Sequence, residues 1–291
     1  MKIIFRIILL FIAISIAITT TWSFASSHTV HIGIEPGAVY QGNTFVVKVF
    51  SEKPLKSAQA KIFDRSVPLF PWSYKWRGII GVPVKTSPGK YKIWLVLNYK
   101  DGTQDRFYRF VTVKKRYFEE RSYTLKPKKM ALLAPEIIEE DWEIIQRELL
   151  RERKTPLWRG NFIIPTRGII SMPFGAVQNI NGKRHSPHNG VDFANDPWTK
   201  VRAANAGQVV LARELKAHGN TVIIDHGNGV LTMYLHLVKI AVKKNDIVWK
   251  GRVIGYMGST GVATGTHLHF GMSIHDVRVN PLEWVYRTVA K

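Results

Sequence analysis

Cysteine is absent from the 291 residues of the chain. Its absence excludes a disulfide framework, a zinc finger built on thiolates, a cysteine nucleophile and a lipoprotein anchored through an N-terminal cysteine. Acidic residues are scarce as well, because 21 Asp and Glu stand against 42 Lys and Arg and leave a formal net charge of +21. Such a charge is compatible with a nucleic acid, an anionic membrane or an acidic polymer as partner, but it does not distinguish among these three.

The remaining composition is that of a folded protein. Hydrophobic residues make up 45% of the chain and aromatic residues 11%, which is too much for a disordered polybasic tail. The length suffices for two ordinary domains and a connector.

The N-terminus has the pattern of a secretory signal. Lys2 and Arg6 precede the apolar run Ile7–Ile18, and small residues follow up to Ala25. This order predicts a signal peptide over residues 1–25 that is cut after Ala25. An uncleaved membrane anchor is the alternative, because the run could be extended to spanning length. Either way the rest of the chain leaves the cytoplasm, so we expect no nucleic-acid partner. We expect a periplasmic location, with secretion or membrane anchoring as alternatives.

Residues 26–115 are predicted to be all β. Polar and apolar residues alternate in Thr44–Phe50 and Lys90–Leu97, and glycine-containing turns recur between such segments. About seven short strands in fewer than 90 residues favour an immunoglobulin-like β-sandwich. Titratable residues do not cluster there, so we interpret this domain as a spacer or binding module.

Residues 116–160 are predicted to be a charged, partly helical connector. Pro135 and the acidic residues after it suit a helix N-terminus, and Glu136–Arg153 has apolar residues near helical spacing. From residue 161 to 291 the pattern is β again, with strands expected at Thr221–Asp225, Val230–Leu237 and Thr266–Ser273. The sequence therefore predicts a mainly β protein with two domains.

Histidines concentrate in the C-terminal domain, where eight of the ten lie between His185 and His275. His267 and His269 are two residues apart on a predicted strand, so both imidazoles face the same side. His188 is expected in a loop and Asp192 on the short strand that follows it, because Gly190 makes a helix poor there. His236 alternates with apolar neighbours on another strand.

This combination of side chains suits a catalytic metal ion. Neutral imidazoles and a carboxylate are ligands that Zn²⁺ prefers, and three protein ligands leave a fourth position open for water. Two further histidines beside the metal could move protons or stabilise an oxyanion.

The same residues resemble the lysostaphin-type (LytM-like) zinc endopeptidases of bacterial cell walls. The resemblance covers roughly Ile164–Trp284, and its motifs follow in the family's order. They are Ser186-Pro187-His188-Asn189-Gly190-Val191-Asp192, Val201-Arg202-Ala203-Ala204, Gly207-Gln208-Val209-Val210, His226-Gly227-Asn228-Gly229, Tyr234-Leu235-His236-Leu237, Gly258-Ser259-Thr260-Gly261 and Thr264-Gly265-Thr266-His267-Leu268-His269-Phe270. The separate motifs are weak signals, but together they are very specific.

The resemblance implies that His188, Asp192 and His269 bind zinc and that His236 and His267 are the catalytic histidines. It implies an antiparallel β domain, with the site across one sheet, that hydrolyses the peptide part of peptidoglycan. Some family members have lost ligands and only regulate other hydrolases, but all five positions are occupied here.

Two other functions remain as alternatives, a non-catalytic wall-binding regulator and a metallopeptidase that acts on protein. The N-terminal domain could bind glycan, protein or the catalytic site itself. We expect the other histidines to be structural: His226 closes a hairpin, and His185, His218 and His275 lie at the surface or at the rim of the site.

Overall fold

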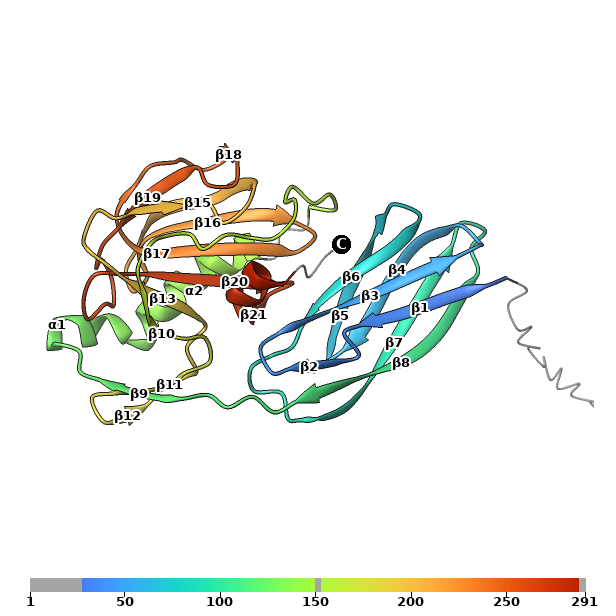
Figure 1. Ribbon diagram of the computed structural model, residues 1–291, viewed down its shortest axis with the longest axis horizontal. Coiled ribbons are helices and arrows are strands. Elements are labelled where there is room, and N and C mark those ends of the chain that lie inside the picture. The colour runs from blue at the N-terminus through green and yellow to red at the C-terminus, as the bar shows by residue number, and fades with distance from the viewer. Residues whose placement is uncertain (1–27, 150–152, 288–291) are drawn as a thin grey trace, which may run out of the picture.

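A computed structural model describes residues 28–149 and 153–287. The predicted signal peptide, residues 1–25, lies outside the described residues. Two β domains lie side by side, joined by an extended segment and a helix (Figure 1). Within the described ranges, no helix is both long enough and apolar enough to cross a membrane.

The N-terminal domain is a single eight-stranded sheet that is rolled up. Its strands are β1 (Val30–Glu35), β2 (Ala38–Tyr40), β3 (Thr44–Ser51), β4 (Leu55–Ile62), β5 (Arg65–Trp72), β6 (Lys75–Gly81), β7 (Gly89–Tyr99) and β8 (Gln104–Lys114). They pair in the order β1-β3-β6-β5-β4-β7-β8-β2. Because β1 and β2 follow each other in the chain but lie at opposite ends of this order, the sheet curls into a near-barrel (Figure 1).

Strand β5 explains why the sheet is continuous. Its first half pairs with β4 and its second half, from Phe70 to Trp72, pairs with β6. The two layers of an immunoglobulin sandwich are separate sheets, whereas here β5 passes from one layer to the other. Inward-facing side chains such as Phe45, Ile80 and Leu95 fill the space between the layers. The predicted mainly β class is confirmed, with eight strands where about seven are expected.

The C-terminal domain is built on a ten-stranded sheet. Its main path runs β10 (Ile169–Met172), β13 (Gly190–Ala194), β20 (His267–Ile274), β17 (Val230–Ile240), β16 (Gly219–Gly227), β15 (Gly207–Leu215) and β18 (Ile247–Val248). Strands β14 (Lys200–Arg202), β19 (Val253–Met257) and β21 (Val277–Val279) pair beside this path, and helix α3 (Pro281–Tyr286) follows. All of these pairings are antiparallel. The three strands predicted in this domain coincide with β16, β17 and β20.

The connector is part of the C-terminal domain's structure. Its strand β9 (Glu120–Tyr123) pairs in parallel with β11 (Val177–Ile180), which also pairs with β12 (Lys183–Arg184). The helices α1 (Pro127–Met130), η1 (Ala131–Leu133) and α2 (Pro135–Leu149) follow. The predicted helix is thus present through Leu149, and residues 150–152 lie outside the described residues.

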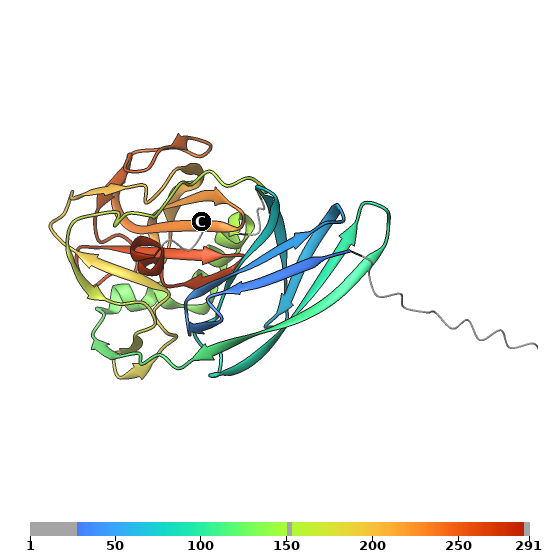
Figure 2. The same ribbon diagram turned by 45° about the vertical axis from the view of Figure 1, so that its right-hand side comes forward.

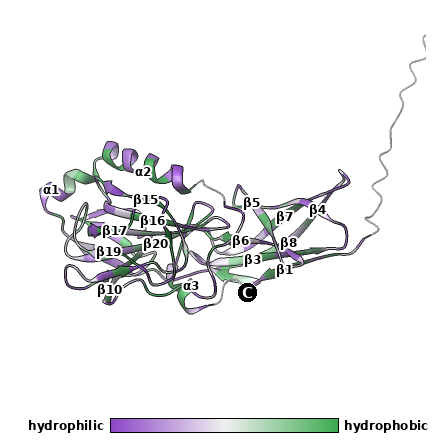
Figure 3. Ribbon diagram, turned by 90° about the horizontal axis from the view of Figure 1, so that it is seen from above, coloured by the Kyte–Doolittle hydropathy of each residue, from purple (hydrophilic) through white to green (hydrophobic). Residues whose placement is uncertain are grey.

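Helix α2 is amphipathic and covers one side of the C-terminal sheet (Figure 3). Its buried residues Ile145 and Leu149 pack against strands β15, β16 and β17 through Leu211, Ile223 and Met233. Removing these apolar surfaces from water stabilises the docked helix.

The two domains lie against each other (Figure 2), and a buried polar contact as well as apolar packing joins them. The amide and hydroxyl of Thr44 on β3 both donate to Oε2 of Glu283 on α3, at 2.8 and 2.9 Å. Beside it, Gly81 on β6 lies so close to β21 that an added Cβ would stand 2.8 Å from Val279. The domain interface therefore has no room for a larger side chain at this position.

Candidate metal centre

Two adjacent strands bring two of the predicted ligands together. Asp192 on β13 is the direct antiparallel partner of His269 on β20. Side chains at opposed positions of neighbouring strands point to the same face of the sheet. His188 reaches the same point from the loop that precedes β13. Asp192 and His269, 77 positions apart in the sequence, therefore meet because of the strand register. The loop before β13 brings His188 to His269, which is 81 positions away.

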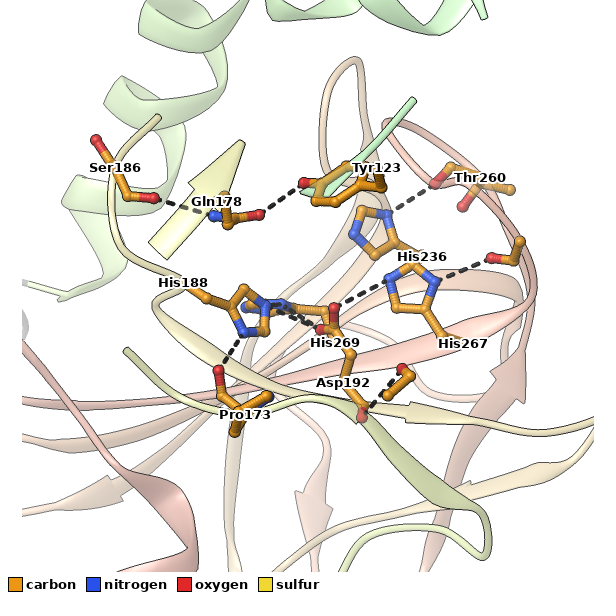
Figure 4. A network of polar contacts seen from close by, with 12 residues as sticks. Tyr123, Pro173, Gln178, Ser186, His188, Asp192, His236, Thr260, His267 and His269 are labelled. Carbon is orange, nitrogen blue, oxygen red and sulfur yellow. Dashed lines mark hydrogen bonds and ion pairs between the residues drawn. The ribbon is translucent and has the colours of Figure 1, made fainter. Parts of the chain in front are cut away.

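The three donor atoms form a compact triangle (Figure 4). His269 Nδ1 lies 2.9 Å from Asp192 Oδ1 and 3.0 Å from His188 Nε2, and His188 Nε2 lies 3.1 Å from Asp192 Oδ1. All three residues are buried or nearly so. Three electron-pair donors that face one another at this spacing are a candidate metal site, and the set of two imidazoles and a carboxylate suits zinc.

A backbone carbonyl fixes the orientation of His188. Its Nδ1 lies 3.1 Å from the carbonyl oxygen of Pro173, which only accepts hydrogen bonds. Nδ1 must therefore carry the proton, and in the neutral ring the lone pair is on Nε2, the atom that faces Asp192 and His269. Partners of this kind orient metal-binding histidines and increase their basicity.

Gly190 makes room for His269. A Cβ at this position would lie 2.6 Å from His269 Nε2 and 2.7 Å from the carbonyl oxygen of Phe270. The backbone of β13 and the imidazole could not both keep their places if residue 190 had a side chain. The expectation that Gly190 shapes the ligand loop is consistent with this contact.

His236 and His267 lie together beside the triangle (Figure 4). Their ring centroids are 4.8 Å apart, and His267 Nε2 is 3.8 Å from Asp192 Oδ2. His236 Nδ1 bonds the carbonyl of Thr260 at 2.8 Å, and His267 Nδ1 bonds that of Gly265 at 2.9 Å. By the same argument as for His188, each neutral ring has its lone pair on Nε2.

His236 occupies an unusual backbone conformation. Its φ angle is +63°, in the left-handed region that residues with a Cβ seldom adopt. On one side of it Leu235 pairs with His269 on β20, and on the other Leu237 pairs with Met257 on β19. The strand thus changes partners at His236. Such local strain is held by the surrounding structure and often occurs at functional sites.

The electrostatics of the cluster favour a negative carboxylate at Asp192 and neutral rings at His236 and His269. Burial alone would raise the pKa of Asp192, but hydrogen bonds and positive charge from His188 and His269 hold it well below its usual range. Burial lowers the pKa of His269 to about 4, although Asp192 opposes the shift. Burial, followed by the neighbouring His267 and His269, also lowers the pKa of His236 far below its usual value. Deprotonated donors are the form that binds a metal.

Tyr123 is a neighbour of the site that the sequence reasoning did not single out. It lies on connector strand β9, and its hydroxyl donates to Gln178 Oε1 on β11 at 2.7 Å (Figure 4). Burial raises its pKa to about 12, and the charge of Asp192 adds to the shift. No local pattern could have indicated this residue, because the parallel pairing of β9 and β11 brings it to the site.

Asp141 on α2 is a second residue that the sequence reasoning missed. Its buried carboxylate accepts hydrogen bonds from the amides of Lys216, Ala217 and His218, and from His218 Nδ1 at 2.8 Å. The carbonyl of His218 in turn accepts from the amide of His236 at 3.2 Å. The connector helix therefore holds the turn on which the backbone of His236 rests.

Two of the remaining histidines lie away from the donor triangle. His226 is fully buried near the end of β16, where Nδ1 donates to the carbonyl of Ala206 and Nε2 bonds Thr232 across the hairpin. Burial lowers its pKa to about 4. His275 is half-buried against Phe70 of the N-terminal domain, so it lies at the domain interface rather than at the rim of the site.

Residues 186–281, which include the triangle and both additional histidines, match the profile of peptidase family M23. The C-terminal domain belongs to peptidase family M23. The resemblance to lysostaphin-type peptidases inferred from the sequence is thereby confirmed.

Two relatives show what this M23 domain is similar to. It is 46% identical over 101 residues to peptidoglycan DD-endopeptidase ShyA of Vibrio cholerae. The aligned segment covers 35% of this chain and 24% of that protein. It is 39% identical over 113 residues to DD-carboxypeptidase/endopeptidase Mpg of Neisseria meningitidis, covering 39% of this chain and 26% of that protein. The matched segment thus spans about a quarter of the length of these relatives.

A crystal structure of a protein from Pseudomonas aeruginosa, named as a putative peptidase M23, extends the similarity beyond the M23 domain. It superposes with a TM-score of 0.60 at 27% identity and covers 84% of this chain and 94% of its own. The arrangement of an N-terminal β domain with an M23 domain therefore recurs in another protein.

Proposed function

We propose that this protein is an exported zinc-dependent endopeptidase that hydrolyses the peptide cross-links of bacterial peptidoglycan. One observation carries the proposal: in a domain of family M23, donor atoms of His188, Asp192 and His269 form a triangle, and the rings of His236 and His267 lie together beside it. One relative of that domain is named as a peptidoglycan DD-endopeptidase and another as a DD-carboxypeptidase/endopeptidase, which supports the substrate.

In this proposal His188, Asp192 and His269 hold the zinc. Bound there, zinc would lower the pKa of a coordinated water toward neutrality and polarise the scissile carbonyl. The protein contributes the ligand geometry, in which Pro173 orients His188 and Gly190 admits His269. Asp192 supplies the negative charge that a dication needs among neutral ligands.

His236 and His267 are the proposed catalytic residues. Each is fixed by a backbone carbonyl so that an unprotonated Nε2 is available in the neutral ring. One can accept a proton from the attacking water and later deliver it to the leaving amine, while the other, once protonated, stabilises the charge that develops on the carbonyl oxygen.

The other parts of the chain fit this role. We propose that residues 1–25 direct export to the periplasm, that 26–115 form a binding module, that 116–160 connect it, and that 161–291 form the peptidase domain. Of the 42 basic residues, 15 lie in 26–115 and 15 in 161–291, against 5 and 7 acidic residues. Both domains are therefore suited to an anionic polymer such as the cell wall.

Two measurements test the proposal together. Elemental analysis is expected to find one zinc per chain, and mass spectrometry of purified sacculi is expected to show that cross-linked muropeptides disappear and monomers accumulate. A chelated sample is the control, and adding zinc back is expected to restore digestion. A zinc-free, inert protein that stimulates another hydrolase would instead indicate a regulator. Digestion of casein with intact sacculi would indicate a peptidase for proteins.

A further inference from the structure

The N-terminal domain has a row of aromatic side chains on the outside of its sheet. Trp94 on β7 is 46% exposed, and Tyr108 and Phe110 on β8 are 51% and 41% exposed. We call these three residues the aromatic stripe. Single exposed aromatic residues are common, but a contiguous group is typical of a binding surface.

Strand pairing makes the stripe continuous. Trp94 is the direct partner of Tyr108, and Phe110 lies two residues further along β8 on the same face. The ring centroids are 5.6 Å apart from Trp94 to Tyr108 and 5.7 Å apart from Tyr108 to Phe110. The rings contact one another edge to face, so they hold each other in place.

Lysines lie over the same rings. Lys92 Nζ is 5.2 Å from the ring of Trp94 and 5.0 Å from that of Tyr108, and Lys90 Nζ is 4.5 Å from that of Phe110. Towards the edge of the sheet the pattern continues, because Tyr40 on β2 is 47% exposed and pairs with Lys114 on β8.

The outward-facing charged side chains of β4, β7 and β8 are all basic. Alternation along β4, β7 and β8 turns the basic residues Lys61, Lys90, Lys92, Arg106 and Lys114 outward. Asp105, the only acidic residue of these three described strands, faces inward and accepts a hydrogen bond from Tyr99. The surface thus combines flat apolar rings with unopposed positive charge.

We propose that the aromatic stripe is a binding site for the glycan strands of peptidoglycan. Exposed aromatic rings pack against the apolar C–H groups of sugar rings, and three such rings in mutual contact offer one continuous surface for them. The lysines would meet the carboxylates of the attached peptides. The inference rests on the proposed function, because that function supplies a polymer with both sugars and acid groups.

Only a short segment of chain separates the strand that carries the stripe from the strand beside the active site. Strand β8 carries Tyr108 and Phe110, and an extended segment leads from its end at Lys114 to β9 (Figure 1). On β9, Tyr123 lies beside the metal centre (Figure 4). A glycan strand held on β7 and β8 would keep its own peptide stems near the peptidase domain. Effective concentration, rather than new catalytic contacts, would then raise the rate on the polymer.

Co-sedimentation of the full chain with purified sacculi tests the proposal. Every sample contains His267→Ala, so that the polymer is not digested during the measurement. The double variant Trp94→Ala/Tyr108→Ala is expected to bind about tenfold more weakly, a loss of roughly 1.4 kcal/mol. The matched control is Tyr74→Ala, because Tyr74 is 72% exposed and also has a lysine, Lys75, 4.9 Å from its ring. This control is expected to bind like the parent protein.

Competition with defined ligands identifies what the stripe binds. Glycan strands freed of peptides are expected to compete with sacculi for the parent protein and not for the double variant. Equal binding by both proteins would overturn the proposal. Loss of binding to phosphatidylglycerol vesicles or to DNA in the double variant, with glycan binding unchanged, would also overturn it. If the double variant does not fold, Trp94→Ser and Tyr108→Ser are measured singly, with Trp94→Phe as the variant that keeps a ring.

Hydrolysis of a soluble cross-linked muropeptide dimer separates this inference from the proposed function. With His267 intact, the stripe variant is expected to cut the dimer as fast as the wild type and to digest sacculi several-fold more slowly. Failure of the wild type to cut the dimer would count against the proposed function and leave the binding result standing. Normal cleavage of the dimer with undiminished sacculus binding would refute only the glycan site.

Discussion

Asp192 is the residue on which the cluster converges. Its Oδ1 contacts His188 and His269, and its Oδ2 faces His267. Asp192→Ala removes one of the three proposed ligands and the only negative charge among them, so zinc content is expected to fall from about one per chain to near zero. Elemental analysis of the purified variant measures this. Asp196→Ala, in the exposed loop after the same strand, is the control and should keep its zinc.

His267 is expected to act on the substrate rather than on the metal. In His267→Ala the three ligands are intact, so zinc should be retained while the rate of cross-link hydrolysis falls by about 10²- to 10⁴-fold. Zinc content and muropeptide analysis of the same sample check both parts. A fully active variant would refute the catalytic role. His31→Ala, which removes an exposed histidine of β1, is expected to change neither value.

Gly190 tests the packing behind the ligands. A methyl group there would meet His269 Nε2 at 2.6 Å, so Gly190→Ala should displace the imidazole and weaken zinc binding by at least about tenfold. Competition with a zinc-binding dye measures the affinity. Gly265 is a suitable control, because a Cβ at that position meets nothing within 4 Å. Equal zinc affinities in the two variants would show that the His269 imidazole can shift away from the added methyl group and still bind zinc.

Helix α2 contributes a buried charge to the catalytic domain. Asp141 accepts hydrogen bonds from three backbone amides and from His218, and these outweigh burial and hold its pKa at about 2, below the ordinary 3.8. Asp141→Asn is therefore expected to reduce the free energy of unfolding at neutral pH by about 2 kcal/mol. Chemical denaturation measures the loss, with Glu143→Gln on the exposed side of α2 as the control.

The same variant has a defined pH dependence. A carboxylate whose pKa is lowered by folding stabilises the protein above the unfolded-state pKa, and that contribution is lost as the pH falls through the folded-state pKa. The difference in stability between wild type and Asp141→Asn should therefore shrink from about pH 4 toward pH 2. A difference that stays constant over this range would show that the ionised carboxylate is not what stabilises the turn.

The elements differ in how far the sequence could predict them. Strands β16, β17 and β20 were predictable because their apolar patterns are long, and the two-residue spacing of His267 and His269 followed from strand geometry. Strand β9 was not, because Glu120–Tyr123 is short and mostly exposed, so it has no apolar alternation. Its place depends on pairing with β11, more than 50 residues away. The left-handed backbone of His236 likewise depends on a change of partner strands.

At the scale of the whole molecule, charge is expected to govern contact with the wall. Electrostatic attraction between exposed charges weakens as the Debye length falls from about 10 Å at 0.1 M salt to about 3 Å at 1 M. Sedimentation of the full chain with sacculi should therefore decline over this range. Hydrolysis of a small soluble muropeptide dimer is the control and should change much less. Retention that does not depend on salt would mean that the excess of basic residues plays no part in binding.

The pairing of β9 with β11 and the packing of α2 determine where the catalytic unit begins. A piece that starts at residue 161 would leave β11 without its parallel partner and would expose the apolar surface that Ile145 and Leu149 cover. It would also lack Asp141, and with it the support of the turn under His236. The smallest unit that can be transferred to another protein is therefore the M23 sheet together with its connector. The sheet of residues 26–115 could be exchanged only for one that keeps the contacts of Thr44 and Gly81 with this unit.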